Sequence, residues 1–320
     1  MLDLLYLLAG IGLLTFGGEF LIRGSLGIAN KANISPLLTG LVIVGFGTSM
    51  PELVVSVDAA INRQPDIAIG NVVGSNIANI LLILGLCAVI TPLHVSPLSL
   101  KRDAIIVIAT SLLFILLSLS NSLNLAGSIF LLASLASYLS WSYWTDKNKQ
   151  APSAALHEAE ATEIIITPKS TTFTLIEVIG GLALLISGSQ VLLKSATGLA
   201  SDLGVSEAVI GLTLVAVGTS LPELTISVIA AIRKHADVAI GNILGSNIFN
   251  ILGILGVSAA IQPLSVTGRV LIFDQWVMLG VAILLYIFLY TGKILSRLEG
   301  LCLLAAYIAY VALSYTQFAN

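Results

Sequence analysis

The chain has 320 residues, of which 57% are hydrophobic and 10% charged, and its mean hydropathy is +1.03. Soluble domains carry roughly 25% charged residues, so this composition excludes an ordinary soluble protein and indicates a membrane protein with several spans. The net charge is −3 and the basic residues are spread over short loops, which argues against nucleic acid as a partner, whereas the apolar composition predicts contact with membrane lipid.

A membrane-spanning helix needs about 20 mainly apolar residues. Ten segments meet this requirement, so the sequence predicts an all-α membrane protein with ten transmembrane helices. In chain order the segments are residues 4–28, 36–62, 67–92, 103–120, 123–144, 174–200, 207–232, 238–262, 271–291 and 298–316. Most connections are short; residues 145–173 are polar and charged, and are predicted to be a linker loop.

The two halves of the chain are related to each other. A shift of 171 residues aligns 45–85 with 216–256, and 26 of these 41 positions are identical without a gap. Chance does not produce such a match, so the chain contains an internal duplication. The predicted units are a first repeat at 1–144 with its motif region (α-repeat 1) at about 36–92, the linker at 145–173, and a second repeat at 174–320 with α-repeat 2 at about 207–263.

The number of spans in each half determines how the copies are oriented. Five is an odd number, so the second copy enters the membrane in the opposite direction, and the prediction is two inverted five-helix repeats. Inverted repeats are typical of transporters, whose binding site lies between the halves near the middle of the membrane. Arginine and lysine favour the cytoplasmic side. Arg63, Lys194 and Arg269 fall on one side and the other eleven on the opposite side, which predicts external termini and a cytoplasmic 145–173 loop.

The first motif occurs as "GTSMPE" at 47–52 and as "GTSLPE" at 218–223, inside predicted spans. A proline leaves the carbonyl four residues earlier without its helical hydrogen bond, and in a membrane such a carbonyl is tolerated where it faces a cavity or a ligand. A glutamate within a span is costly and marks function by default. Each copy places two hydroxyls and one carboxylate together: Thr48, Ser49 and Glu52 in the first, and Thr219, Ser220 and Glu223 in the second.

The second motif opens the next span in each copy, as "GNVVGSNIAN" at 70–79 and "GNILGSNIFN" at 241–250. Residues four apart share one face of a helix. The motif therefore predicts a polar face on each helix, and its glycines, also four apart, permit close helix packing. We expect these faces to point amide and hydroxyl oxygens at the carboxylates; they consist of Asn71, Ser75 and Asn79, and of Asn242, Ser246 and Asn250.

Two carboxylates among hydroxyl, amide and carbonyl oxygens suit a hard cation. Calcium accepts six to eight oxygens in a flexible geometry, whereas magnesium demands an octahedron. The motifs contain no histidine or cysteine, which disfavours zinc and copper. Two carboxylates neutralise one Ca²⁺, two Na⁺ or two H⁺ equally well, so exchange with Na⁺ and exchange with H⁺ are both open. A cation channel is a more distant alternative, and nothing in the sequence resembles the nucleophile of an enzyme.

Both motifs resemble the two α-repeats of the sodium/calcium exchanger family, in its prokaryotic type, within the cation/calcium antiporter superfamily. The resemblance covers both repeats. It implies an antiporter that exchanges Ca²⁺ for Na⁺ by alternating access, with both ions as cargo, no organic cofactor, and a monomer in a prokaryotic cell (inner) membrane. It also implies that spans 2, 3, 7 and 8 form the ion-binding core, and that spans 1 and 6 slide against it.

The resemblance assigns roles to individual residues. The carboxylates of Glu52 and Glu223 and the carbonyls of Thr48 and Thr219 would bind Ca²⁺. Two flanking sodium sites would be formed by Ser49, Ser246 and the Gly45 carbonyl, and by Ser220, Ser75 and the Ala216 carbonyl. Asn79 and Asn250 complete the predicted metal-binding set; several sodium-coupled members carry an aspartate where this chain has Asn250. The proton-coupled branch usually has Glu-His where this chain has Gly74-Ser75 and Gly245-Ser246, which favours sodium.

Two further charges fall within the predicted spans. Asp58 follows Glu52 by six residues and its counterpart in the other repeat is Ile229. It is interpreted as a charge near the outer mouth, in a vestibule or at a solvated helix end. Glu19 corresponds to Gln190, so a hydrogen bond between spans 1 and 6 is expected there.

Overall fold

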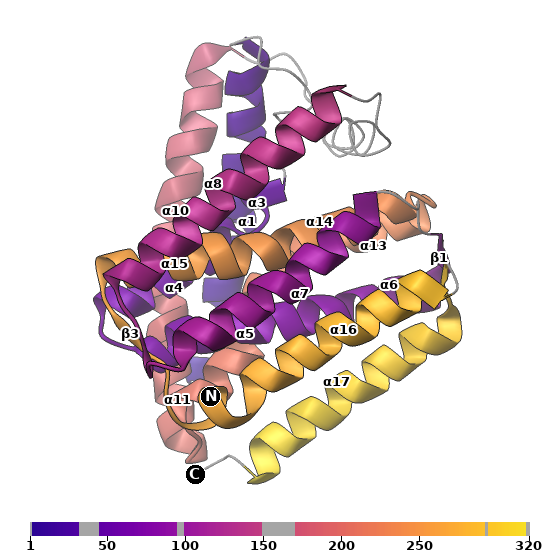
Figure 1. Cartoon of the computed structure of the whole chain (residues 1–320). Coiled ribbons are helices and arrows are strands. Elements are labelled where there is room, and N and C mark those ends of the chain that lie inside the picture. Colours follow the sequence, from indigo (N-terminus) through magenta and orange to yellow (C-terminus); the bar gives the residue numbers. More distant parts are fainter. Residues whose placement is uncertain (1, 32–44, 95–98, 149–169, 292–293, 318–320) are drawn as a thin grey trace.

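The computed structural model describes residues 2–31, 45–94, 99–148, 170–291 and 294–317, and within these ranges the chain is helical apart from turns and two-residue strands (Figure 1). The elements of the first half are α1 (Leu2–Lys31), α3 (Gly45–Gly47), α4 (Met50–Ile61), α5 (Pro65–Ala78), the π-helical η2 (Asn79–Leu84), α6 (Gly85–Ile90), β1 (Leu93–His94), α7 (Ser99–Ser118), β2 (Ser122–Leu123) and α8 (Leu125–Asn148).

The second half repeats this order of elements. It contains α10 (Thr171–Leu203), α11 (Glu207–Ile210), the π-helical η3 (Gly211–Val215), α12 (Ala216–Thr219), α13 (Leu221–Ile232), α14 (Ala236–Phe249), the π-helical η4 (Asn250–Ile254), α15 (Leu255–Ile261), β3 (Leu264–Ser265), the π-helical η5 (Val270–Asp274), α16 (Gln275–Thr291), β4 (Ile294–Leu295) and α17 (Arg297–Gln317).

Most of the predicted spans correspond to long apolar helices. Seven helices among the described residues are long and apolar enough to cross a membrane, and the bent pair 207–219 with 221–232 makes an eighth if it is one span. These eight match eight of the ten predicted segments. The predicted span 103–120 corresponds to α7, and residues 36–44 of the predicted span 36–62 lie outside the described residues.

The predicted linker 145–173 is shorter than expected at both ends. Helix α8 continues to Asn148, and α10 already begins at Thr171. The N-terminus of α10 is capped by Ser170, whose hydroxyl accepts a hydrogen bond from the Phe173 amide at 3.2 Å. Polar residues at a helix end remain helical when a capping side chain satisfies the backbone amides. The start of the sixth span was therefore predicted too late, because Thr171 and Thr172 are polar but helical. Residues 149–169 lie outside the described part of the chain.

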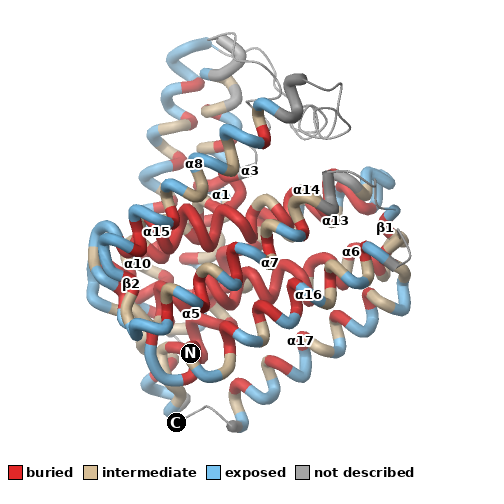
Figure 2. The backbone as a smooth tube through the Cα atoms, in the orientation of Figure 1, coloured by how far each residue is buried: buried red, intermediate tan, exposed pale blue. Residues whose placement is uncertain are grey.

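The helices that carry the second motif form the centre of the molecule (Figure 2). In the most apolar 18-residue stretch, 78% of the residues are buried in Pro65–Ile90 and 89% in Val238–Ile261, against 17% in Leu125–Trp144. A helix that is buried on all sides belongs to a core, whereas one with an exposed apolar surface faces lipid in a membrane protein. Helices α5 and α14–α15 are therefore the core, and α8 lies at the periphery.

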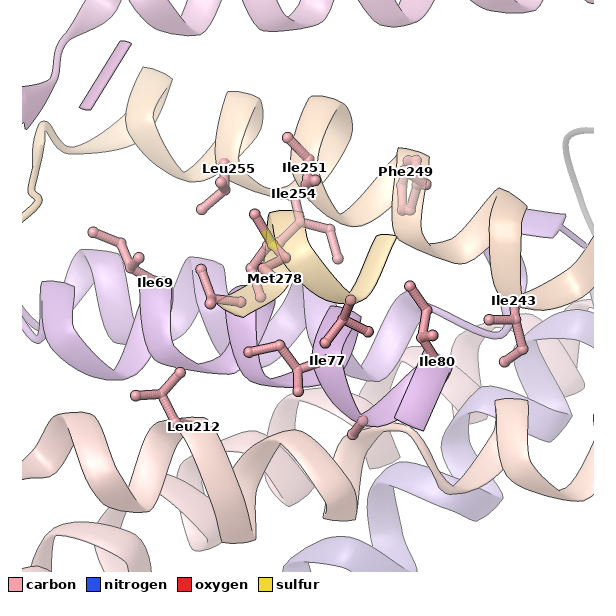
Figure 3. Close-up of a cluster of buried hydrophobic side chains, with 14 of the residues drawn as sticks. Ile69, Ile77, Ile80, Leu212, Ile243, Phe249, Ile251, Ile254, Leu255 and Met278 are labelled. Atoms are coloured by element: carbon pink, nitrogen blue, oxygen red, sulfur yellow. The ribbon is translucent and has the colours of Figure 1, made fainter. Parts of the chain in front are cut away.

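Apolar side chains fill the space around these central helices (Figure 3). Ile69 and Ile77 project from α5, and Ile251 and Ile254 from η4. Met278 of α16 reaches between the two segments, and all five side chains are at most 2% exposed. The packing leaves the polar side chains of the motifs enclosed by protein rather than by solvent.

Helices α1 and α10 form a long pair that stands across the remaining helices (Figure 1). Glycines on α1 recur every seven residues, which is two helical turns, so they lie on one side of the helix. A side chain at any of them would collide with α10. The facing residues run in opposite directions, which makes the pair antiparallel: Gly10 lies against Leu192, Gly17 against Leu185, and Gly24 against Val178.

Short strands tie the two halves together. Strand β1 pairs antiparallel with β4, and β2 pairs antiparallel with β3, so each pair joins one strand from each half. In the alignment of the halves, Leu93 of β1 corresponds to Leu264 of β3. Equivalent segments therefore make equivalent contacts with the opposite half.

Candidate functional site

The helices that carry the first motif are broken within it, at Ser49 and at Ser220. Ser220, between α12 and α13, has φ −81° and ψ 12°, and its counterpart Ser49 has φ −86° and ψ 12°. The axes of 207–219 and 221–232 differ by 49°. Pro51 and Pro222 lie in the first turn of the helix that follows each break, where proline removes no helical hydrogen bond. These prolines therefore begin a new helix after each break, and do not interrupt a continuous helix as the sequence had suggested.

Two serine–glutamate hydrogen bonds cross between the halves. The Ser49 hydroxyl donates to Glu223 Oε1 at 2.8 Å, and the Ser220 hydroxyl donates to Glu52 Oε1 at 2.8 Å. We call these two bonds the crossed pairs. All four residues are at most 2% exposed. Each glutamate is thus held by the broken segment of the opposite half, and the two carboxylates belong to one buried site.

Four buried oxygen atoms of predicted site residues accept no hydrogen bond from the described residues. They are Oε2 of Glu52, Oε2 of Glu223, Oδ1 of Asn79 and Oδ1 of Asn250. Leaving a buried acceptor unpaired costs about 1–3 kcal/mol, and more for a charged group. The amide oxygens can only accept, and so can the carboxylate oxygens when they are ionised, so a cation satisfies all four atoms and an anion does not. This donor set fits a hard metal ion such as Ca²⁺ or Na⁺.

The serines predicted to flank the carboxylates, Ser246 and Ser75, each contact another predicted site residue. The Ser246 hydroxyl donates to Glu223 Oε1 at 3.4 Å and is 3.5 Å from the Thr48 hydroxyl. On the other side, the Ser75 hydroxyl donates to the Ala216 carbonyl at 3.3 Å, and the Thr219 hydroxyl oxygen lies 3.2 Å from the same carbonyl oxygen. The structure therefore brings these predicted site residues together.

The remaining predicted site residues are placed less directly. Asn79 and Asn250 lie at the first positions of η2 and η4, where the helix widens into a π-helical turn; such turns are frequent at functional sites. Gly45 is the first residue of α3, one turn before Ser49. None of the hydrogen bonds given above involves Gly45. Gly74 packs directly against the backbone of Leu212, so the predicted close helix approach is confirmed there, whereas at the equivalent Gly245 no described atom lies within 4 Å of an added side chain.

Asn71 and Asn242 were predicted to point amide oxygens at the carboxylates, but they support the site from behind. Asn71 donates to the Glu52 carbonyl at 3.2 Å and to the Ser56 hydroxyl at 3.0 Å, and it accepts from Thr219 at 3.0 Å. Asn242 repeats this arrangement and donates to the hydroxyl of Ser227 at 3.0 Å. Ser56 and Ser227 were not assigned to the site from the sequence, and the signal that could have identified them is the serine at the same position in both copies of the duplication.

The two additional charges have partners that the sequence did not reveal. Asp58 accepts a hydrogen bond from Ser189 of α10 at 2.9 Å, so it joins α4 to the long helix pair. Glu19 forms an ion pair with Arg23, one turn later in α1, and both side chains are 47% exposed. The expected hydrogen bond from Glu19 to α10 is therefore wrong, because the nearer and always charged arginine competes for the carboxylate.

Comparison with known proteins agrees with this architecture. The chain is 38% identical to CaxA of Alkalimonas amylolytica over 98% of both chains. It is 32% identical to the sodium/calcium exchanger MaX1 of Methanosarcina acetivorans, again over 98% of each. A structure of the sodium-calcium exchanger NCX_Mj, soaked with 100 mM Na⁺ and 10 mM Sr²⁺, matches with a TM-score of 0.66 and 33% identity, over 97% of this chain and 98% of that one.

The chain also matches the model of a whole protein family. Residues 2–144 and 173–316 align with the family described as sodium/calcium exchanger protein, which covers both halves and omits the linker. The chain is thus an integral membrane protein with several apolar helices, and it belongs to the sodium/calcium exchanger family.

Proposed function

We propose that this protein is a secondary antiporter that exchanges Ca²⁺ for Na⁺ across the membrane by alternating access. The observation that carries the proposal is the arrangement of the crossed pairs. Each buried glutamate has one oxygen bonded to a serine of the opposite half and one oxygen without a partner among the described residues. A cation at the unpartnered oxygens would join the two halves through both carboxylates.

Charge provides the coupling in this mechanism. Without ions the site holds two carboxylates in a low-dielectric core, where unpaired charges cost several kcal/mol each. The site must be filled before the protein can rearrange, by one Ca²⁺ or by monovalent cations. Because the same carboxylates serve both cargoes, the inward movement of one requires the outward movement of the other. No covalent chemistry is needed, in keeping with a transporter rather than an enzyme.

Individual roles follow the predicted assignment. Glu52 and Glu223, with the carbonyls of Thr48 and Thr219, would bind Ca²⁺. Sodium would bind on either side, near Ser49, Ser246 and the Gly45 carbonyl, and near Ser220, Ser75 and the Ala216 carbonyl; Asn79 and Asn250 would complete the set. The short distances from Ser246 to Glu223 and from Ser75 to the Ala216 carbonyl support this division.

The proposed architecture is ten spans arranged as two inverted repeats, in a prokaryotic inner membrane. The pairing of β1 with β4 and of β2 with β3 supports it, because equivalent strands of the two halves exchange partners. A relative from Escherichia coli, 32% identical over 97% of this chain, is an inner membrane protein. The distribution of lysine and arginine supports external termini and a cytoplasmic 145–173 loop. A single chain contains both halves of the site, so the monomer is the proposed working unit.

Transport into proteoliposomes tests the proposal. We expect Ca²⁺ uptake when a Na⁺ gradient is imposed alone, and little uptake when a pH gradient is imposed alone. Ser75→Ala and Ser246→Ala should raise the Na⁺ concentration needed for the half-maximal rate, since sodium needs the serine oxygens and protons do not. Uptake driven fully by the pH gradient, with both variants unchanged, would identify a proton exchanger. Ca²⁺ flux that needs no counterion would identify a channel.

A further inference from the structure

Four buried asparagines form a hydrogen-bonded network between the two central helices. They are two pairs of equivalent residues in the duplication, and each is at most 1% exposed: Asn76 with Asn247, and Asn79 with Asn250. Asn79 Nδ2 donates to Asn247 Oδ1 at 2.9 Å, and Asn250 Nδ2 donates to Asn76 Oδ1 at 3.2 Å. Each predicted metal-binding asparagine therefore uses its NH₂ group on an asparagine of the other half.

The orientation of the Asn79 amide is determined by a backbone contact. Asn247 Nδ2 donates to the carbonyl oxygen of Asn76 at 3.2 Å, and a carbonyl can only accept. The Oδ1 atom of Asn247 must then face Asn79, and Asn79 must donate a hydrogen bond to it from its NH₂ group. Asn79 Oδ1 is left pointing away from the network, and among the described residues it has no donor. An amide flip at Asn79 would set two oxygen atoms against each other.

The orientation of the Asn250 amide rests on a weaker contact. Asn76 Nδ2 donates to the sulfur atom of Met278 at 3.6 Å, and a thioether is a weak acceptor. Met278 is 2% exposed and reaches between the two central segments (Figure 3). Turning the Asn76 amide costs less than turning that of Asn247. If Asn76 turned, Asn250 would have to turn with it and present its NH₂ group in place of its oxygen.

We propose that Asn247 and Asn76 are positioning residues that aim the amide oxygens of Asn79 and Asn250 at the transported cation, and that Met278 sets the orientation of the second amide. This inference rests on the proposed function. A carboxamide attracts a cation through its oxygen and repels it through its NH₂ group, so the orientation decides whether Asn79 and Asn250 are ligands at all. Side chains that orient metal ligands typically change metal affinity by about 10–100-fold when they are replaced.

A double-mutant cycle separates positioning from a general structural role. Asn247→Leu keeps the size of the side chain and removes its hydrogen bonds, so the Asn79 amide can turn. We expect the Ca²⁺ concentration for the half-maximal rate to rise roughly tenfold, with a smaller change in the maximal rate. In an Asn79→Asp background Asn247→Leu should no longer raise that concentration, since a carboxylate presents an oxygen in either orientation and the leucine removes the Asn247 oxygen that faces it.

The structure supplies a matched control. Asn247 bonds to Asn79 and not to Asn250, so an Asn250→Asp background should leave the effect of Asn247→Leu intact. Met278→Leu is a second variant that preserves the apolar core if Asn247→Leu does not fold. It should raise the half-maximal Ca²⁺ concentration a few-fold, and Asn250→Asp should cancel that rise.

The outcomes distinguish this inference from the proposed function. Equal effects of Asn247→Leu in the wild-type and Asn79→Asp backgrounds would overturn the positioning role and leave Ca²⁺ transport by the wild-type protein standing. An unchanged half-maximal Ca²⁺ concentration in Asn247→Leu and Met278→Leu would overturn it as well. Absence of Na⁺-driven Ca²⁺ uptake by the wild-type protein would refute the proposed function itself, whatever the variants do.

Discussion

Gly180 and Gly181 are neighbours in α10, yet a methyl group would meet very different surroundings at the two positions. At Gly181 it would lie 2.6 Å from the Leu21 amide nitrogen and 2.8 Å from the Gly17 carbonyl oxygen, both in the backbone of α1. At Gly180 no atom lies within 4 Å among the described residues. Gly181→Ala should therefore push α1 and α10 apart, and Gly180→Ala should not.

The size of the effect follows from these distances. Carbon atoms pack at about 3.5–4.0 Å, so the methyl group at Gly181 is roughly 1 Å too close to atoms that cannot rotate away. Overpacking of this kind costs about 1–3 kcal/mol. Both substitutions gain the same helix propensity, up to about 1 kcal/mol, so the difference between the variants isolates the steric cost.

Thermal unfolding in detergent and Ca²⁺ transport measure the two consequences. The midpoint of unfolding should be lower in Gly181→Ala than in Gly180→Ala by roughly 2–10 °C. Gly181→Ala should also transport Ca²⁺ more slowly at an unchanged half-maximal Ca²⁺ concentration, because α1 and α10 supply none of the proposed ligands. If the two variants are indistinguishable in stability and in rate, the close packing of α1 against α10 is not important for this protein.

Glu52→Gln and Glu223→Gln should each abolish Ca²⁺ transport while the protein stays folded, because glutamine keeps an acceptor for the crossed pair and loses the charge. Near-normal exchange in either variant would remove the replaced carboxylate from the proposed site. Asp274→Asn should lower the unfolding midpoint more than Asp103→Asn, because breaking a buried ion pair costs about 3–5 kcal/mol. The side chains of the Arg269–Asp274 pair are 6% and 0% exposed, and those of the Arg102–Asp103 pair are 13% and 15% exposed. A larger drop in Asp103→Asn would contradict this. A cysteine at Ser153, in a background without the two native cysteines, should be shielded from impermeant thiol reagents in intact cells, and ready labelling would reverse the proposed topology.

The sequence predicted the parts of the site that depend on one helix at a time. Proline marked each copy of the first motif as a local disturbance of the helix, because its effect on the backbone is local. The spacing of Asn71, Ser75 and Asn79 predicted a shared face, because helical periodicity is local too. The duplication identified the equivalent residues in the second half without any information about packing.

The contacts between the halves could not be predicted in this way. The sequence does not show that Ser49 bonds to Glu223 and Ser220 to Glu52, since that pairing depends on how the two halves meet. Asn76 and Asn247 lie in the same motif as the proposed ligands, next to Ser75 and Ser246. The motif does not show that they bond to Asn250 and Asn79 of the opposite half. Asp58 has no polar counterpart in the second half, and its partner Ser189 lies on a distant segment.

Equilibrium binding of Ca²⁺ to the purified protein, with Na⁺ as the competitor, tests the central claim most directly. If both ions use Glu52 and Glu223, added Na⁺ should raise the apparent Kd for Ca²⁺, and more steeply than in proportion to its concentration, because more than one Na⁺ replaces each Ca²⁺. Glu223→Gln should remove the high-affinity binding. Ca²⁺ binding that is unaffected by Na⁺, or that persists in both glutamine variants, would contradict a shared carboxylate site.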